Sequence, residues 1–389
     1  MRKDKRKKRT ILTQNGLLAY TRTILRPSDK KNLEKLQSLE GKKSVAPLDF
    51  YLGIDTLPFK MTAGAMLQVA YLAQNQCSYQ RAEDAIMQFH HVRINDDTIR
   101  SVTNFIGGIV FAEDCRRADE HYNLLKTAKL PFDQDKKGVL YLECDGAALN
   151  TRHKNSDGST WRENKLCMAF SSDNIHSWID KKGKRQHQIG KREYVSYIGS
   201  VTEFKKHMLT CAVRNGYGKY KKTIVISDGA IWIENLIDEV FHGSLHILDF
   251  FHLSENVFEY SKYLFNMDET KYQPWAKEIC HSLRLSDYKA VLGELEPLKD
   301  KLSKCPINLY NYITNNINNI DYKYYEKKGY FIGSGAIESG NKIILQQRLK
   351  QAGMRWNVKS AQALLTLRTK AESGIWKLDV EDLIYRIFR

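Results

Sequence analysis

Two apolar segments that each run into an Asp-Gly pair constrain the fold of this chain more than any other feature. Residues 138–144 (GVLYLEC) precede Asp145-Gly146, and residues 223–227 (TIVIS) precede Asp228-Gly229. Short, nearly continuous apolar runs bounded by turn residues are typical of strands that are buried on both faces. We therefore expect two inner strands of one sheet, each followed at its carboxyl end by an aspartate.

The segments around these two strands define an order of elements. Strand patterns at 165–171 and 193–200 are separated by a basic, glycine-containing loop at 181–192, and helical patterns at 201–215 and 230–241 flank the strand at 223–227. With a last strand at 245–251 the order is β-β-β-α-β-α-β. This is the order of ribonuclease-H-like domains, in which a mixed sheet carries carboxylates on its first strand and just after its fourth. We predict an α/β fold of this class, with the fourth strand beside the first.

The rest of the chain is predicted to flank or interrupt this core. Residues 1–50 read as a basic arm, a hairpin turning at Asn15-Gly16 and a linker, and residues 51–130 as a mainly helical DNA-binding region. The catalytic core is expected at 131–255, a helical insertion at 256–330, and the carboxyl-terminal part of the core at 331–389.

Positive charge indicates a polyanionic partner. The chain has 389 residues, a formal charge of +16 and a pI near 9.3. Residues 1–9 and 339–371 hold seven basic residues each, and the loop at 181–192 is basic as well. Such an excess concentrates phosphate polyanions around a protein. Three separate basic segments suit a long nucleic acid that crosses several elements.

Several classes of protein are excluded by what the sequence lacks. No apolar run approaches the roughly 20 residues that cross a bilayer, and no signal-peptide pattern follows the charged start. The seven cysteines contain no CxxC pair, so neither a disulfide framework nor a zinc ribbon is indicated. Residues 333–338 (GSGAIE) fail the GxGxxG fingerprint, and no nucleotide cofactor is predicted. We expect a cytoplasmic, nucleoid-associated protein with reduced cysteines.

Asp145 and Asp228 are the leading catalytic candidates. If the fourth strand lies beside the first, these two aspartates become neighbours at one edge of the sheet. An Asp-Gly pair by itself is more often a turn, but two of them at the strand ends that the topology requires point to a site. Two Mg²⁺ or Mn²⁺ ions held roughly 4 Å apart by carboxylates can stabilise both the attacking and the leaving oxygen of a phosphodiester.

Glu338 is the third candidate carboxylate. It begins a helix after a glycine-rich segment, 333–340, whose small residues allow backbone and substrate to approach closely. The alternative is an ordinary acidic residue favoured by the amino end of a helix. We expect Asp145, Asp228 and Glu338 to hold two divalent ions, with Lys342 four residues further along the same helix face.

Three further polar residues are secondary candidates. Asp249 and His252 lie three residues apart at the end of the last strand, where they could steady the metal site or form a structural pair. Glu143 lies two residues before Asp145 on the same strand face, so it is the substitute if Asp145 is not a ligand.

Residues 78–106 have the pattern of a helix-turn-helix. Apolar positions repeat at three- and four-residue steps over 78–89, residues 91–95 form a turn, and a second helix places Arg100 and Asn104 on its outer face. Two short packed helices also occur in cores of every kind. If the motif reads DNA, Arg100 and Asn104 are the expected contacts.

Four segments in order resemble a known family. They are YLECDGAALNTR, VISDGAIWI, HILDFFHLSENV and GSGAIESGNKIILQQRLKQAGMRW. Together, over about residues 140–376, they resemble prokaryotic insertion-sequence transposases related to the Mutator class, in particular the ISLre-type group. The resemblance implies a DDE triad of Asp145, Asp228 and Glu338, and it matches Asp249 and His252 to the acid-x-x-His element after the second aspartate.

The resemblance also implies a reaction and its partners. It implies metal-dependent cleavage of double-stranded DNA at inverted-repeat ends, strand transfer into target DNA, and a homodimer or higher oligomer on the paired ends. The expected DNA contacts in the basic segment 339–371 are Lys342, Arg348, Lys350 and Arg355. Two alternatives stay open: a nuclease or resolvase of the same fold that hydrolyses without strand transfer, and a non-catalytic helix-turn-helix regulator.

Overall fold

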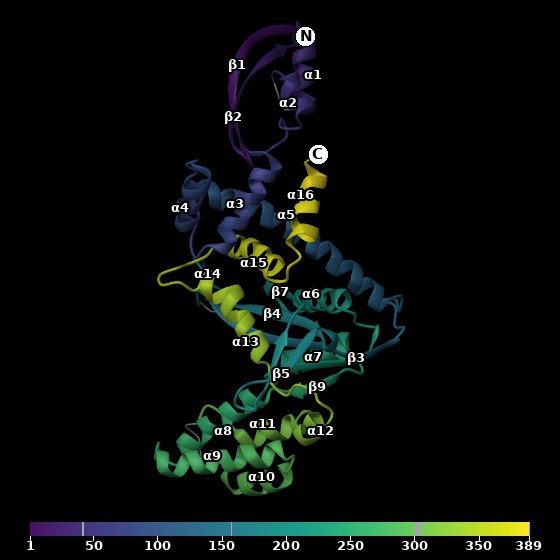
Figure 1. Ribbon diagram of the computed structural model, residues 1–389, viewed down its shortest axis with the longest axis vertical. Helices are drawn as coiled ribbons and strands as arrows, with labels where there is room; N and C mark the ends of the chain where they lie inside the picture. Colours follow the sequence, from purple (N-terminus) through teal and green to yellow (C-terminus); the bar gives the residue numbers. More distant parts are fainter. Residues whose placement is uncertain (41–42, 157, 300–304, 389) are drawn as a thin grey trace. The chain divides into compact units, whose positions relative to one another are not determined.

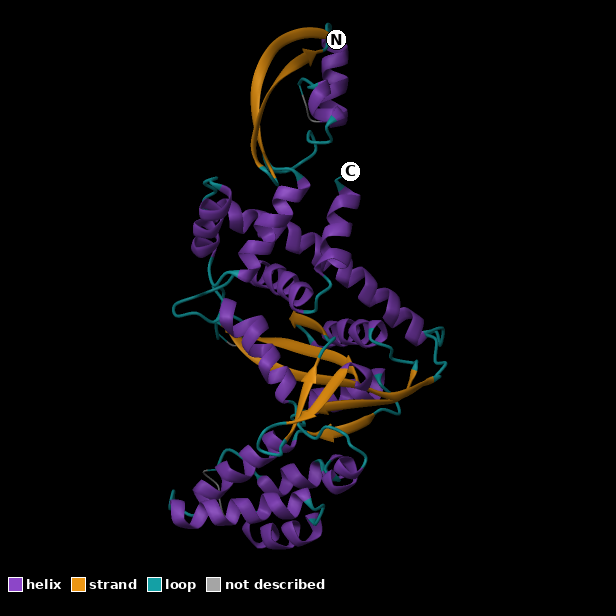
Figure 2. Ribbon diagram, viewed as in Figure 1, coloured by secondary structure: helices purple, strands orange, loops and turns teal. Residues whose placement is uncertain are grey.

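The computed structural model describes residues 1–40, 43–156, 158–299 and 305–388 (Figures 1 and 2). The chain forms two compact units. Unit 1 consists of Met1–Asp114, Asn150–Thr160 and Ile344–Arg389, and unit 2 of Cys115–Leu149 and Trp161–Ile343. Within the described ranges no helix has both the length and the apolar character of a membrane span. The five-segment division expected from the sequence stays a prediction.

A mixed five-stranded sheet is the centre of unit 2 and makes it an α/β structure. The strand order is β7-β4-β3-β8-β9. β3 is parallel to β8, β8 is parallel to β9, and β4 is antiparallel to β7. The five strands are β3 (Lys136–Asn150), β4 (Trp161–Ser171), β7 (Glu193–Ile198), β8 (Tyr220–Ser227) and β9 (Leu245–Leu248). β8, which precedes the second Asp-Gly pair, therefore lies between β3 and β9.

Side chains that alternate along β3 separate the two faces of this sheet. Leu140, Leu142 and Cys144 belong to one buried cluster with side chains of α6 (Val201–Arg214) and α7 (Ile231–Val240). Tyr141 and Glu143 are buried as well, and the alternation of a strand places them on the opposite face. Asp145 continues this second series, so its carboxylate faces away from α6 and α7.

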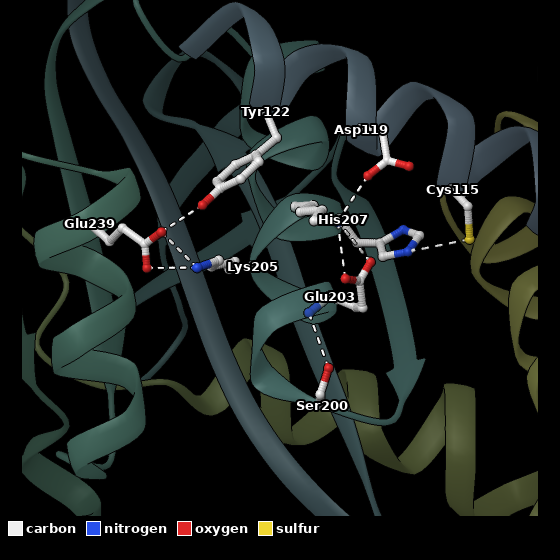
Figure 3. A network of polar contacts seen from close by, with 9 residues as sticks. Cys115, Asp119, Tyr122, Ser200, Glu203, Lys205, His207 and Glu239 are labelled. Atoms are coloured by element: carbon white, nitrogen blue, oxygen red, sulfur yellow. Dashed lines mark hydrogen bonds and ion pairs between the residues drawn. The ribbon is translucent and has the colours of Figure 1, made fainter. Parts of the chain in front are cut away.

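Polar contacts attach the end of α5 (Asp96–Lys126) to α6 and α7, as Figure 3 shows. Tyr122 in α5 donates a hydrogen bond to Glu239, which also accepts one from Lys205 in α6 at 2.6 Å. Lys206 lies 2.9 Å from Asp119, and this contact raises the pKa of the Lys206 ammonium above its usual value. These contacts join α5 to the two helices on one face of the sheet, and Asp145 lies on the other face.

Beyond the last strand the chain is helical, as the sequence indicates. The helices of this region are α8 (Phe250–Leu264), α9 (Glu269–Arg284), α10 (Tyr288–Leu295), α11 (Leu309–Asn315) and α12 (Tyr322–Lys327). The chain then returns to the sheet in α13 (Gly335–Asn341). A π-helical segment (Lys342–Gln346) follows, and then α14 (Gln347–Leu349), which belongs to unit 1. Gly340 of α13 lies close to Leu166 and Tyr194, which places α13 against β4 and β7.

Unit 1 is built on a helical core with a two-stranded sheet. Its helices are α1 (Lys30–Glu40), α2 (Pro47–Tyr51), α3 (Ala63–Asn75), α4 (Tyr79–His90), the first part of α5, α15 (Val358–Glu372) and α16 (Asp382–Ile387). Buried side chains of α3, α4, α5, α15 and α16 form one apolar cluster. β1 (Arg2–Thr13) and β2 (Gly16–Arg26) form an antiparallel ribbon (Figure 1).

Three local expectations from the sequence are wrong. The basic residues expected as an arm before the hairpin belong to β1 itself. The expected basic loop at 181–192 contains a strand, since β5 (Ile175–Ile179) pairs with β6 (Arg185–Ile189). The last strand ends at Leu248 rather than 251, because the Asp249 side chain accepts a hydrogen bond from the Phe251 amide and caps α8. An apolar run alone does not separate a strand from the first turn of a helix.

Candidate active site

The pairing of β3 with β8 brings two of the expected carboxylates to the same level of the sheet. Glu143 of β3 is paired with Ile226 of β8 in a parallel register. Asp145 and Asp228 each follow two residues later, on neighbouring strands that lie roughly 4.8 Å apart. Asp228 comes directly after β8, but β3 continues to Asn150, so the expectation that Asp145 ends its strand is wrong. Asp145 lies instead just beyond the last paired position of β3 with β8. Burial raises the pKa of Asp145, and the negative charge of Asp228 adds to that rise. The two aspartates therefore interact electrostatically, as two carboxylates that share a cation would.

Asn341 of α13 contacts the side chain of Asp145. Its Nδ2 donates a hydrogen bond to Asp145 Oδ2. The other amide atom, Asn341 Oδ1, is buried and has no hydrogen-bond partner in the part of the chain that the structure describes. An orphaned buried acceptor is costly unless water or an ion satisfies it. An unpaired oxygen beside a carboxylate is the kind of donor that a hard divalent cation or its bound water uses.

Glu338 lies in a second group of potential ligands. The ligand atoms of Asp249, His252 and Glu338 all lie within 4.8 Å of one another. Glu338 and His252 are half-buried, so they stay accessible to a ligand, whereas Asp249 has no exposed surface. An imidazole among carboxylates suits Mn²⁺ at least as well as Mg²⁺, which prefers oxygen.

Both carboxylate oxygens of Asp249 already accept hydrogen bonds from the protein. Its Oδ1 accepts a hydrogen bond from the Phe251 amide at 2.7 Å, and its Oδ2 accepts from the Ser334 amide at 3.0 Å and from the Ser334 hydroxyl. Ser334 immediately precedes α13. Asp249 therefore ties the start of α8 to the start of the helix that carries Glu338. A Cβ at Gly333 would clash with the exposed Phe251 ring unless that ring moved, so glycine allows the close approach seen here.

The three expected carboxylates, Asp145, Asp228 and Glu338, do not form one compact three-ligand group within the described ranges; Glu338 groups with Asp249 and His252 instead. Two ions roughly 4 Å apart do not require all their ligands to lie within one coordination shell. In the described ranges the donors that fit one cation are Asp249, His252 and Glu338, and a second cation beside Asp145 and Asp228 stays a prediction.

Glu143 is buried and supports α13 from the sheet. Its Oε2 accepts a hydrogen bond from the Ile337 amide at 2.9 Å. Burial raises the pKa of Glu143 to about 8, with further contributions from the nearby Asp249 and Glu338 charges. Glu143 therefore holds the backbone of α13 through the Ile337 amide, and within the described ranges it does not belong to the possible metal-ligand group of Asp249, His252 and Glu338.

The raised pKa of Glu143 predicts how stability changes with pH. The folded state keeps a proton up to about pH 8, whereas the unfolded chain loses it near its ordinary pKa of about 4.5. Stability contributed by this group therefore falls as pH rises between these values, by roughly 1.4 kcal/mol per pH unit. Glu143→Gln keeps the acceptor for Ile337 and should flatten this slope. Urea unfolding in EDTA from pH 5 to 8 measures it, and parallel curves for both proteins would contradict it.

Two tyrosines from the helical region hold the ends of β8 and β9. Tyr312 of α11 donates a hydrogen bond to the Asp228 carbonyl at 2.8 Å, and Tyr322 of α12 donates one to the Leu248 carbonyl at 3.0 Å. Burial raises the pKa of both hydroxyls, so both stay protonated donors. No local sequence pattern indicates these contacts, or those of Asn341 and Ser334, because each depends on a partner far away along the chain.

A cavity of about 530 Å³ opens beside α13 on the Asp145 face of the sheet. Its wall includes the buried Glu143, the aromatic residues Tyr194 and Phe331, and Ser339 of α13. Arg192 lines it too and donates a hydrogen bond to the Tyr194 hydroxyl at 2.8 Å. The cavity therefore lies beside the helix that carries Glu338, although Asp145, Asp228 and Glu338 are not among its lining residues, and it offers both positive charge and aromatic surface.

The residues expected to contact DNA fall into two groups. Lys342, Lys350 and Arg355 are exposed, so they are available to a polyanion. Arg348 is only 1% exposed, and its guanidinium lies over the rings of Tyr79 and Trp356. The expectation for Arg348 is wrong in this structure, because its charge is used inside unit 1.

The two helices at the expected helix-turn-helix also differ from the prediction. α4 and α5 are present, but α5 has 31 residues and is not a short recognition helix. Arg100 is exposed and pairs with Asp97 one turn earlier at 2.7 Å. The side-chain oxygen of Asn104 is buried, so Asn104 does not lie on an open outer face as expected.

No family model and no curated protein matches this chain. The likeness to insertion-sequence transposases therefore stands on the four sequence segments alone. The arrangement of Asp145, Asp228, Glu338 and the residues that hold them is the structural basis for a proposal about function.

Proposed function

We propose that this chain is a DDE transposase of the ISLre-type group, which cleaves DNA at inverted-repeat ends and joins the freed ends to target DNA. The proposed metal-binding carboxylates are Asp145, Asp228 and Glu338. One observation carries the proposal: Asp145 and Asp228 each lie two residues after the paired positions Glu143 and Ile226 of two neighbouring parallel strands. Aspartates at the same level of two adjacent strands can place two carboxylates on one cation.

The topology of the sheet supports the same proposal. If the β5–β6 hairpin is set aside, the chain order of the strands and helices around the sheet is β-β-β-α-β-α-β, and the first and fourth strands are neighbours. A ribonuclease-H-like fold requires this neighbourhood, and we propose that fold for unit 2. Fold alone does not establish chemistry, so the argument depends on the carboxylates.

In the proposed reaction, water attacks a phosphodiester at the element end, and the freed 3′ hydroxyl then attacks a phosphodiester of the target. The second step breaks one phosphodiester and forms another. When bound, two Mg²⁺ or Mn²⁺ ions stabilise charge on the attacking and leaving oxygens. Asn341 orients Asp145, while Glu143 and Asp249 fix the helix that carries Glu338.

The basic charge of the chain supports DNA as the substrate, and two ends must be brought together for one insertion. We therefore propose a homodimer or higher oligomer on paired ends, in association with the nucleoid. Lys342, Lys350 and Arg355 are the exposed candidates from the basic segment for contact with the phosphate backbone.

A cleavage and strand-transfer assay tests the proposal. Duplex DNA carrying the repeats that flank the gene is incubated with a target plasmid and the full chain, with Mg²⁺, Mn²⁺ or EDTA. We expect joined products with either metal and none in EDTA. Cutting without joining would favour a nuclease or resolvase, and specific binding without any product would favour a DNA-binding regulator.

A further inference from the structure

The β1–β2 ribbon of unit 1 has a large excess of positive charge. β1 contains seven basic residues and a single acid, Asp4, which pairs with Arg26 of β2 at 3.2 Å. Arg22 of β2 adds a further cation. Two antiparallel strands of 12 and 11 residues extend for on the order of 40 Å, which is about one turn of B-form DNA.

One face of the ribbon is occupied by the protein itself. Cross-strand partners share a face, and Arg9 is opposite Tyr20 while Lys7 is opposite Arg22. The buried Asp49 of α2 accepts hydrogen bonds from Arg9 and, at 2.6 Å, from the Tyr20 hydroxyl, and it pairs with Arg22. This carboxylate fixes the ribbon on α2 and neutralises part of the charge on this face.

The opposite face is open. It contains Arg6 opposite Thr23, Lys8 opposite Thr21, and Thr10. All of these side chains are exposed except the half-buried Thr23. Neither Arg6 nor Lys8 has an ion-pair partner among the residues that the structure describes. The face thus combines unpaired cations with a row of hydroxyl and methyl groups.

We propose that this open face of the ribbon enters the major groove of double-stranded DNA, so that the ribbon, not the α4–α5 pair, reads the element ends. This inference rests on the proposed function for its biological substrate. The major groove of B-form DNA admits a two-stranded β-ribbon, whereas the major groove of double-stranded RNA is too narrow for one. Arg6 and Lys8 suit guanine edges or phosphates, and the threonines suit thymine methyl groups and polar base edges.

The structure of α4 and α5 favours this assignment. Arg100 is engaged by Asp97, and the Asn104 side-chain oxygen is buried. These were the two side chains that a recognition helix would have used. The ribbon, in contrast, is rigidly held on one face and chemically open on the other, as a reader of DNA needs to be.

A binding experiment with charge-matched variants tests the proposal. Fluorescence anisotropy without divalent metal measures affinity for a duplex from the element end and for a scrambled duplex. Arg6→Ala with Lys8→Ala should weaken specific binding at least about tenfold and lower the salt slope by about two. Lys5→Ala with Lys7→Ala removes the same charge from the other face of β1 and should weaken binding less than about threefold. Equal losses for the two double variants would overturn the proposal.

A variant pair without charge change tests base reading directly. Thr21→Val with Thr23→Val removes two hydroxyls, keeps the shape and suits a strand. We expect the ratio of specific to scrambled affinity to fall about tenfold, with an unchanged salt slope, and we expect N7-methylation of guanines to interfere with wild-type binding. An unchanged ratio, or equal affinity for double-stranded RNA, would contradict the major-groove assignment. Thermal unfolding of each variant shows that the ribbon still folds.

Failure of this inference can be told apart from failure of the proposed function. If the wild type binds through Arg6 and Lys8 but never cuts DNA in Mg²⁺ or Mn²⁺, the transposase proposal fails and the ribbon assignment stands. If the wild type cuts and joins DNA while all the ribbon variants bind like wild type, the ribbon assignment fails and the transposase proposal stands.

Discussion

Asp228→Asn should lower the rate of DNA cleavage at least about a thousandfold, which corresponds to about 4 kcal/mol of transition-state stabilisation. The substitution removes one negative charge from the pair that Asp145 and Asp228 form on the neighbouring strands β3 and β8. It keeps the local structure, because the Asn side-chain oxygen can still accept the hydrogen bond that Asp228 Oδ1 receives from the Ala230 amide at 3.1 Å. Single-turnover cleavage in Mg²⁺ measures the rate.

A matched control separates loss of chemistry from loss of charge. Asp238→Asn makes the same change at an exposed position of α7, and its cleavage rate should stay within about twofold of wild type. DNA affinity without metal should be unchanged in both variants, because neither aspartate is proposed to contact phosphate. A rate for Asp228→Asn within tenfold of wild type would remove Asp228 from the site.

Arg348→Ala should lower the free energy of unfolding by about 3 kcal/mol, without a specific effect on DNA binding. The guanidinium lies 4.6 Å from the centre of the Tyr79 ring and 5.3 Å from that of Trp356, and its Nε donates a hydrogen bond to the Ala73 carbonyl at 3.2 Å. Loss of two buried cation–π contacts, a charge-assisted hydrogen bond and the packing of a large side chain accounts for this magnitude. Urea unfolding of the full chain measures it.

A nearby exposed cation is the control for Arg348. Lys350→Ala removes a positive charge two residues away and should change the free energy of unfolding by less than about 0.5 kcal/mol. Arg348→Lys should behave more like the alanine variant than like wild type, because an ammonium lacks the planar shape that stacks between two rings. If Arg348→Ala unfolds like wild type but weakens DNA binding, the original expectation of a DNA contact is correct.

Local sequence patterns were sufficient to predict that a strand leads to each of the two aspartates. The apolar runs before Asp145 and Asp228 do lie in strands, β3 and β8, and this signal lies within a few residues of each carboxylate. The Asp-Gly pair marks a strand end only at Asp228, because β3 continues through Asp145-Gly146 to Asn150. The neighbourhood of the two aspartates required a topological assumption, and the parallel pairing of β3 with β8 agrees with it. Glu338 could be placed on a helix because small residues precede it, although that helix begins at Gly335, three residues before Glu338.

Residues whose roles depend on distant partners could not be predicted. In the sequence Arg348 resembles an ordinary exposed basic residue. Its burial depends on the rings of Tyr79 and Trp356, which come from two other segments of the chain. Tyr312 and Tyr322 belong to a region that has no catalytic pattern of its own, yet their hydroxyls hold the carbonyls at two strand ends. Aromatic composition alone does not show which hydroxyl finds a buried acceptor.

The hydrogen bond from Asn341 to Asp145 joins residues 196 positions apart, and that from Ser334 to Asp249 spans 85. During synthesis, the strand that carries Asp145 leaves the ribosome long before the helix that orients its side chain. A nascent or prematurely ended chain therefore has Asp145 without α13, the helix whose Asn341 contacts it. The proposed DNA chemistry therefore requires a chain that extends at least through Asn341, so we expect shorter fragments to bind DNA without cutting it.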